Sequence, residues 1–232
     1  MVAIWTGTSG YNYPEWKGRF YPESIGSNAM LGYYAERFPT VEINYSFYRM
    51  PTERLLAGWA AQVPEHFTFT LKAPRRITHD RRLKDCADPL RAFCAAAGSL
   101  GPRLGALLFQ LPPNLRCDLD VFDAFLRDLP PGARCAFEFR HASWLDEPVF
   151  ERLRQRNLAL CVADDGKREA PRVVTADYGY LRLRDEGYDE AVLAEWVAWV
   201  RRQPWREAFV YFKHEDEARG PELAQALIRS LS

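Results

Sequence analysis

The sequence lacks the long hydrophobic run that a membrane span requires, since no apolar stretch approaches about 18 residues. It also lacks an excess of charge of one sign, because 31 lysines and arginines balance 31 aspartates and glutamates. This balance excludes a bulk polycation that coats nucleic acid or membranes. The N-terminal residues show neither the positive segment nor the apolar core of a secretory signal. We therefore expect a cytoplasmic protein with no membrane partner.

Cysteine pairs and histidine clusters are missing as well. The five cysteines are odd in number and widely spaced, without a C-x-x-C pair, which favours reduced and mostly buried thiols. The four histidines form neither H-x-x-x-H nor H-E-x-x-H, the spacings typical of zinc sites on helices. The acidic residues 215–217 beside His214 suit a weak Mg²⁺ contact or a solvated loop. The sequence therefore predicts no metal site and no cofactor.

The composition is that of a globular protein, since 47% of the 232 residues are hydrophobic and 27% are charged. Eight short β-rich runs recur at nearly even intervals. The first and last start 204 residues apart, so about 29 residues separate successive runs, the size of one strand–helix unit. We predict strands at residues 4–8, 41–44, 67–72, 105–111, 134–140, 158–164, 179–184 and 208–214.

Apolar residues at helical spacing lie between most of these strands. The predicted helices are 29–38, 52–62, 89–100, 119–129, 147–156, 190–202 and 221–231. The connection over residues 166–178 is too short and polar for a full helix. Eight such units predict one α/β domain over residues 1–232, a (β/α)₈ TIM barrel with a short or irregular sixth helix. A doubly wound open sheet is the alternative, but the turn after the first strand is not G-x-G-x-x-G.

The ends of the predicted strands are unusually polar. In a TIM barrel these ends form one mouth, where function lies. Side chains alternate along a strand, so Glu138 shares a face with Arg140, and Glu42 shares one with Asn44. The polar residues are Glu42, Asn44, Lys72, Gln110, Glu138, Arg140, His141, Asp164, Arg182, Arg184 and Lys213. Together they predict a functional site, with buried Glu–Arg pairs that only stabilise the fold as the alternative.

Two loops beside the predicted mouth add rings and cations. Residues 9–28 and the segment after the second strand are rich in aromatic residues, among which Tyr11 and Tyr48 are the better candidates to stack on a ligand. The loop after the third strand is basic, which indicates either a solvated face or a contact with phosphates. Its cations are Lys72, Arg75, Arg76, Arg81, Arg82 and Lys84. Residues 1–116 accordingly carry 14 basic and 9 acidic residues.

Two more specific interpretations stay open. Barrels often bind phosphate after the seventh and eighth strands, where Gly220 here precedes a helix whose first N–H groups would be free to meet an anion. Lys72 at a strand end would suit a Schiff base in an apolar site. The cations around Lys72 fit anion binding at least as well.

A set of motifs spans essentially the whole chain. It comprises residues 7–11, 16–18, 20–22, 40–44, 47–49, 72–75, 109–113, 138–141 with Ser143 and Trp144, 180–182 and 211–213. In combination these motifs resemble the domain-of-unknown-function family 72, the YecE-like proteins. The resemblance implies a TIM barrel and supplies no activity. That barrel is distantly similar to the endonuclease IV and xylose isomerase group, but this chain lacks the histidines of a multi-zinc site. Residues 212–215 also depart from the Phe-Asn-Asn of many relatives.

The leading hypothesis is a protein that binds, and as an enzyme would process, a phosphate-bearing ligand such as a nucleic acid or a sugar phosphate. As an enzyme it would be a metal-independent hydrolase, lyase or isomerase with Glu138 as general acid or base, Glu42 as its partner, and Lys72 neutralising negative charge. The expected ligand-binding residues are Tyr11, Asn44, Tyr48, Arg75, Gln110, Arg140, His141, Trp144, Asp164, Arg182 and Lys213. The alternatives are a non-catalytic nucleic-acid-binding module that uses residues 75–84, and a scaffold barrel with structural ion pairs.

Overall fold

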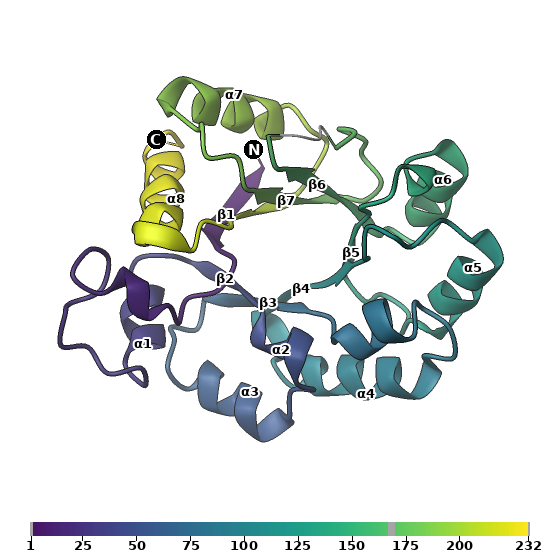
Figure 1. The fold of residues 1–232 in the computed structure, drawn as a ribbon, viewed down its shortest axis with the longest axis horizontal. Helices are drawn as coiled ribbons and strands as arrows, with labels where there is room; N and C mark the ends of the chain where they lie inside the picture. Colours follow the sequence, from purple (N-terminus) through teal and green to yellow (C-terminus); the bar gives the residue numbers. More distant parts are fainter. Residues whose placement is uncertain (1, 167–169, 232) are drawn as a thin grey trace.

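The structure, a computed structural model, describes residues 2–166 and 170–231 and contains eight parallel strands ringed by helices (Figure 1). The strands are β1 (Ala3–Thr8), β2 (Thr40–Ile43), β3 (Thr68–Lys72), β4 (Leu104–Gln110), β5 (Cys135–Glu138), β6 (Ala159–Asp164), β7 (Tyr178–Leu183) and β8 (Glu207–Phe212). They form one sheet in the order β1-β8-β7-β6-β5-β4-β3-β2, and every ladder is parallel. The sheet curls into a nearly closed barrel, which confirms the predicted fold class.

Helices follow nearly every strand. They are α1 (Met30–Ala35), α2 (Tyr45–Tyr48), α3 (Glu53–Ala60), α4 (Ala87–Gly98), α5 (Leu119–Asp128), α6 (Glu147–Gln155), α7 (Glu190–Arg201) and α8 (Arg219–Arg229). Short 3₁₀ turns occur at Pro14–Trp16, Gly101–Arg103, Ala142–Trp144 and Asp216–Ala218, and a π-helix at Arg76–Asp80. Between β6 and β7 the described residues contain no helix, as the polar connection predicted. In the described part of the chain, no helix is long and apolar enough to cross a membrane.

Side-chain caps explain where several helices begin. The Thr52 hydroxyl accepts a hydrogen bond from the Leu55 N–H at 3.2 Å, and a carboxylate oxygen of Asp118 accepts one from Val121 at 3.2 Å. Helix α8 starts at Arg219, two residues before the predicted start at Pro221. Helix α2 was not predicted, because four residues are too few to show a period.

Two apolar cores hold the barrel together. The outer core packs strands against helices and includes Phe137 and Phe139, the outward face of β5 that alternation predicted. The inner core fills the barrel with the rings of Tyr178, Tyr180, Phe209 and Tyr211 and with small residues of β4 to β6. Side chains therefore fill the barrel below its mouth, and the polar residues at the strand ends lie directly above this packed floor of apolar residues.

The barrel closes through a seam between β1 and β2. Within the described residues these two strands share only an isolated bridge between Ser9 and Glu42. The hydroxyl of Tyr34 on α1 fills the gap, because it accepts from the Thr8 N–H at 2.8 Å and donates to the Thr40 carbonyl at 3.1 Å. Tyr34 is completely buried. One tyrosine thus replaces part of the missing ladder.

Replacing Tyr34 by phenylalanine should therefore destabilise the barrel. The variant keeps the ring but leaves a buried N–H and a buried carbonyl without their partner, which costs about 1–3 kcal/mol. The measurement is the free energy of unfolding from urea denaturation. The neighbouring Tyr33→Phe is the matched control, since Tyr33 is only half-buried. Equal urea midpoints for the two variants would show that the hydroxyl does not hold the seam.

All five cysteines are free thiols, as their spacing predicted. Cys135 and Cys161 are completely enclosed by the barrel wall, and burial raises the pKa of the Cys86 and Cys94 thiols to about 11. Thiolate is therefore scarce at neutral pH, and these cysteines are poor nucleophiles.

Candidate functional site

Three charged side chains meet inside the barrel, directly above the inner core. Arg182 on β7 donates from one terminal nitrogen to Glu42 on β2 at 2.9 Å and from the other to Glu138 on β5. The three residues are at most 1% exposed. We call Glu42, Glu138 and Arg182 the interior charge cluster. It confirms that charges from strands far apart in the sequence share one face at the mouth.

Glu42 is held by hydroxyl donors as well as by Arg182. The Ser9 hydroxyl donates to one of its oxygens and the Tyr180 hydroxyl donates to the other at 2.6 Å. Asn44 in turn donates to the Ser9 oxygen at 2.9 Å. Burial alone would raise the pKa of Glu42, but Arg182 and the two hydroxyls outweigh it and hold that pKa below its ordinary value.

Glu138 is surrounded by donors from neighbouring strands. Gln110 donates to it at 2.9 Å, Arg140 donates at 2.8 Å, and Arg184 lies 3.9 Å away. Burial opposes its ionisation, but the charges of Arg182, Arg140 and Arg184 hold the pKa of Glu138 well below its ordinary range. The carboxylate is therefore ionised at neutral pH and weakly basic. Its geometry suits it to orienting Arg140 and Arg184.

Lys72 at the end of β3 differs from every arginine in the site. Its side chain is 7% exposed, and its ammonium lies 4.2 Å from the ring centroid of Phe47. Its amine makes no ion pair or hydrogen bond with any residue that the structure describes. Burial, together with the charge of Arg182, lowers the pKa of Lys72 to about 7. Near neutral pH the amine is therefore divided between its neutral and charged forms.

Three further cations surround the opening and are partly exposed. The exposed fraction of the side chain is 27% for Arg140, 19% for Arg184 and 31% for Lys213. Arg184 lies 3.6 Å from an Asp165 oxygen, and its buried Nε has no hydrogen-bond partner among the described residues. We call Lys72, Arg140, Arg184 and Lys213 the mouth cations. All four lie at or just after the ends of strands, where the polar pattern predicted a site.

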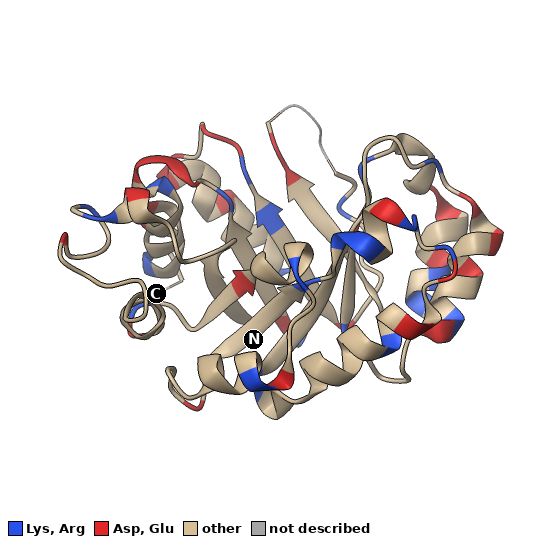
Figure 2. Cartoon of the chain, turned by 60° about the horizontal axis from the view of Figure 1, so that its bottom comes forward, with Lys and Arg blue, Asp and Glu red and all other residues tan. Residues whose placement is uncertain are grey.

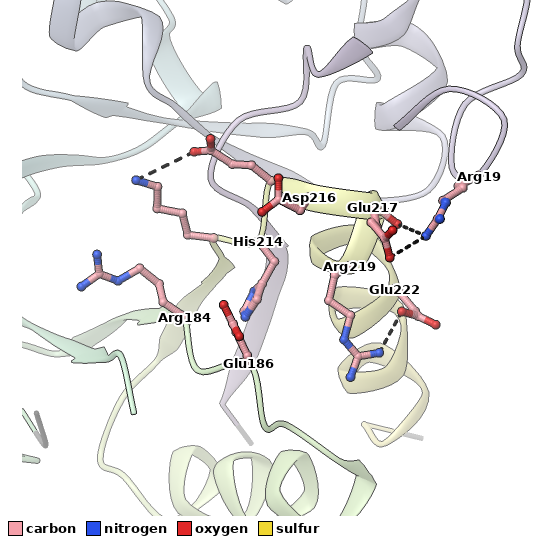
Figure 3. Close-up of a pocket in the computed structure, with 10 residues that line it drawn as sticks. Arg19, Arg184, Glu186, His214, Asp216, Glu217, Arg219 and Glu222 are labelled. Carbon is pink, nitrogen blue, oxygen red and sulfur yellow. Dashed lines mark hydrogen bonds and ion pairs between the residues drawn. The ribbon is translucent and has the colours of Figure 1, made fainter. Parts of the chain in front are cut away.

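Two cavities open beside these cations. One of about 680 Å³ lies at the ends of β5 to β7 and is lined by Glu138, Arg140, His141 and Arg184, among others. The second, of about 620 Å³, lies at the ends of β7 and β8 and is bordered by Arg184 and Lys213 (Figure 3). On its far side Figure 3 shows two surface ion pairs, Arg19 with Glu217 and Arg219 with Glu222. Arg184 therefore contributes to both cavities.

The helix N-terminus expected to bind phosphate after β8 is not free to do so. The Gly220 N–H donates to the His214 carbonyl at 3.2 Å, and the Arg219 N–H donates to the Asp216 carbonyl. Pro221 has no N–H. The first turn of α8 therefore offers no open cradle of N–H groups, and the expectation that its first N–H groups are free to meet an anion is wrong.

Two of the predicted ligand residues are packed away from the mouth cavities. Trp144 is 1% exposed, its indole N–H donates to the Leu115 carbonyl at 2.8 Å, and its ring stacks on Phe139 at 4.8 Å. Tyr11 packs against Tyr34, with ring centroids 6.2 Å apart. These residues lie near strand ends in the sequence, but that position does not indicate the direction in which their rings point.

Other predicted site residues also lie outside the lining of those cavities, namely Asn44, Tyr48, Arg75, Gln110, Asp164, Arg182 and the catalytic candidates Glu42 and Lys72. Tyr48 is 78% exposed, Arg75 forms an ion pair with Asp80 at 3.0 Å, and Asp164 accepts from the Tyr188 hydroxyl at 2.8 Å. Phe47, the residue before Tyr48, is the ring that contacts Lys72. Tyr48 was a predicted ring of the site, but Phe47 is the ring that faces Lys72. Both lie on helix α2, where adjacent residues point in different directions.

Some residues of the site were not among the predicted ligand residues. Ser9, Tyr13, Phe47, Tyr180 and Arg184 all contact it. The alternation of side chains along β7 could have indicated Tyr180 and Arg184. Each lies two residues from Arg182 and therefore shares its face of the sheet. Phe47 is placed by the short helix α2 and Tyr13 by the loop after β1, and the sequence pattern predicted neither conformation.

The basic loop after β3 divides between two places. Lys72 belongs to the mouth, whereas Arg81, Arg82 and Lys84 line a separate cavity of about 620 Å³ together with Arg116. Non-glycine residues in the left-handed region shape this loop, with φ of 50° at Arg82 and 68° at Leu83. Leu83 is buried and anchors the loop to the outer core.

Acidic and basic segments are interspersed over the molecule rather than separated into two faces (Figure 2). Balanced surface charge agrees with the 31 residues of each sign. Within residues 2–166 and 170–231, no group of three or more His, Cys, Asp or Glu side chains is placed to hold a metal ion. The mouth cations are therefore a local feature, and they have acidic neighbours, since Lys213 lies 3.9 Å from Glu215 and five carboxylates line the cavity at the ends of β7 and β8.

Comparison with known proteins adds the family context. The family model described as "Protein of unknown function DUF72" matches residues 5–232. The UPF0759 protein YunF of Bacillus subtilis (strain 168) is 28% identical over 230 residues, covering 92% of this chain and 79% of that protein. The UPF0759 protein YecE of Escherichia coli (strain K12) is 25% identical over 260 residues, covering 98% and 92%. A DUF72 family crystal structure from Thermotoga maritima matches with a TM-score of 0.84 and 27% identity over 99% of both chains.

Proposed function

Because the chain belongs to DUF72, a family described only as of unknown function, we propose a function from its own site: it binds a phosphate-bearing ligand at the mouth of the barrel. The observation that carries the proposal is Lys72, a nearly buried cation without a carboxylate partner among the described residues. A buried charge is costly unless it is paired. The carboxylates of the interior charge cluster are already engaged by Arg182, so an incoming anion is the natural partner for Lys72.

The remaining mouth cations suit the phosphate of such a ligand. Arg140 and Arg184 line the 680 Å³ cavity, and Arg184 and Lys213 line the 620 Å³ cavity beside it. Glu138 accepts a hydrogen bond from Arg140 at 2.8 Å and so holds that planar donor group in place before a ligand arrives, while Arg184 lies 3.9 Å from the same carboxylate. A cavity of this size accommodates a sugar phosphate or a nucleotide rather than a bare ion alone.

Acid–base chemistry on the ligand is better assigned to Lys72 than to Glu138. Glu138 has a strongly lowered pKa and stays ionised, whereas the pKa of Lys72 is lowered to about 7. A group that titrates near the working pH is the more effective proton donor and acceptor. In any chemical step Glu138 and Glu42 would act as positioning residues, and Lys72 would transfer the proton.

Inorganic phosphate and glucose 6-phosphate should therefore raise the melting temperature at constant ionic strength. A ligand at ten times its Kd stabilises by about 1.4 kcal/mol, roughly 3–6 °C for a chain of this size. Arg184→Gln should reduce the shift. Arg206→Gln should not, because the Arg206 side chain is 85% exposed at the opposite end of the barrel. Failure of both phosphates to shift a chain that melts cooperatively would contradict the proposal.

A nucleic acid is the second candidate ligand, favoured by the separate cavity lined by Arg81, Arg82, Lys84 and Arg116. Binding there would follow the phosphate backbone and weaken steeply with salt, by roughly one unit of log–log slope for each neutralised phosphate. Arg82→Gln would then weaken binding of a single-stranded oligonucleotide, while Arg184→Gln would leave it unchanged. The reverse pattern would place the oligonucleotide at the mouth.

A further inference from the structure

Lysine is rare in this chain, and its placement in the site is selective. The sequence has five lysines and 26 arginines. The cations that contact the buried carboxylates Glu42 and Glu138 are all arginines, namely Arg140, Arg182 and Arg184. The amine of Lys72 contacts only a ring among the described residues. A guanidinium pairs with carboxylates better than an ammonium, but only a lysine amine becomes a nucleophile.

The surroundings of Lys72 combine the three features that activate a lysine amine. Its side chain is nearly buried against the ring of Phe47. Burial and the charges of Arg182 and Lys213 oppose its protonation, the carboxylates of Glu42 and Glu138 favour it, and the balance lowers its pKa. Lys72 stands at the carboxyl end of β3, where barrel sites lie, and is 7% exposed. It lies outside the residues that line the 680 Å³ and 620 Å³ cavities, so a carbonyl group would have to reach past that lining to meet the amine.

We propose that Lys72 forms an imine with its ligand, and that the ligand is a phosphorylated aldehyde or ketone. This inference rests on the proposed function, because the other three mouth cations, Arg140, Arg184 and Lys213, would hold the phosphate while Lys72 meets the carbonyl carbon. The interior charge cluster would form the inner wall of the site, next to the phosphate and the carbonyl group.

The chemical step balances without any additional reactant. The lone pair of the Lys72 nitrogen attacks the carbonyl carbon, and a C–N bond forms as the carbonyl π electrons move to oxygen. The two protons of the amine pass to that oxygen, which leaves as water when the C=N bond forms. Uptake of one proton from solvent gives the iminium ion, which withdraws electrons from the adjacent carbon. No oxidation or reduction takes place.

The test uses pyridoxal 5′-phosphate as a phosphorylated aldehyde and sodium borohydride to reduce the imine to a stable secondary amine. The full chain is treated near pH 7.5, digested, and each lysine peptide is quantified by mass spectrometry. With a pKa of about 7, Lys72 is largely neutral at this pH, so we expect labelling at Lys72 to exceed that at exposed Lys84 by roughly tenfold or more. Inorganic phosphate should compete with the reagent, and pyridoxal without the phosphate should label weakly.

Two variants test whether the amine of Lys72 acts as a nucleophile or only as a positive charge. Lys72→Arg keeps a positive charge at this position and should lose the adduct, whereas Lys84→Met should keep both the adduct and the phosphate-induced melting shift. Labelling spread evenly over the exposed lysines, with the phosphate shift intact, would overturn the imine and leave the proposed function standing. Labelling of Lys72 that phosphate does not reduce would support the imine and contradict the phosphate site. Absence of both adduct and phosphate shift would overturn both.

Discussion

Replacing Arg182 by methionine should lower the free energy of unfolding by about 3–5 kcal/mol, the largest effect of any single substitution proposed for this chain. Arg182 is the only cation that bridges both carboxylates, Glu42 and Glu138, among the described residues. Methionine fills much of the space of the arginine stem but leaves two ionised carboxylates in the barrel interior. A domain has only about 5–15 kcal/mol of stability in total. A loss of this size should lower the melting temperature by about 6–20 °C for a chain of this length.

The control is Arg206→Met, which also removes an arginine from an ion pair. Arg206 lies 3.5 Å from Asp177, and its side chain is 85% exposed. Exposed pairs contribute about 0–1 kcal/mol, so this variant should stay close to wild type. The measurement is urea denaturation of both variants at pH 7. Equal losses would show that the interior charge cluster is not held together by Arg182.

A second substitution tests whether an unpaired negative charge causes the loss of stability in Arg182→Met. Glu138 keeps its ion pairs with Arg140 and Arg184 in Arg182→Met, whereas Glu42 loses the ion pair with Arg182. Adding Glu42→Gln removes this unpaired carboxylate and should restore part of the lost stability, a coupling that double-mutant comparison measures directly. The wild-type cluster should also weaken in acid. The pKa values of Glu42 and Glu138 are lowered in the folded state, so their stabilisation is present above the ordinary range near pH 4 and is lost as pH falls below it.

The fold could be predicted because its signals are local and repeated. Each strand is a short apolar run and each helix an amphipathic one, so eight units at even spacing leave few architectures. The seam between β1 and β2 could not be predicted in the same way. It depends on one hydroxyl, that of Tyr34, reaching two strands from a helix that lies between them in sequence.

The site could be predicted in part, and alternation along strands explains which part. Glu42, Glu138 and Arg182 meet because parallel strands end at one rim and inward positions recur every second residue. No comparable rule gives the direction of side chains in loops and short helical turns. Trp144 and Tyr11 turn into aromatic packing, while Phe47 turns toward Lys72, and neither direction follows from neighbouring residue types.

The pH dependence of stability should reveal Lys72 directly. Its pKa is about 7 in the folded chain, against an ordinary value of 10.5. Below pH 7 the amine is protonated in both states, and the folded state carries the full cost of a nearly buried cation. Between pH 7 and about 10 only the unfolded chain holds the proton, so stability from this group rises with pH by up to about 1.4 kcal/mol per pH unit. Above that range the amine is neutral in both states, and the rise ends.

Lys72→Met removes this titration, so the informative quantity is the difference between the variant and wild type. Tyrosines such as Tyr11, whose pKa burial raises to about 12, lower stability at high pH in both proteins and cancel in the difference. The variant should be the more stable protein below pH 7, and its advantage should shrink steadily toward pH 10. Lys84→Met, which removes an exposed amine, should follow the wild-type curve. A constant offset for Lys72→Met across this range would mean that Lys72 stays protonated throughout, which would remove the basis for its role as proton donor and nucleophile while leaving it available as a fixed charge for phosphate.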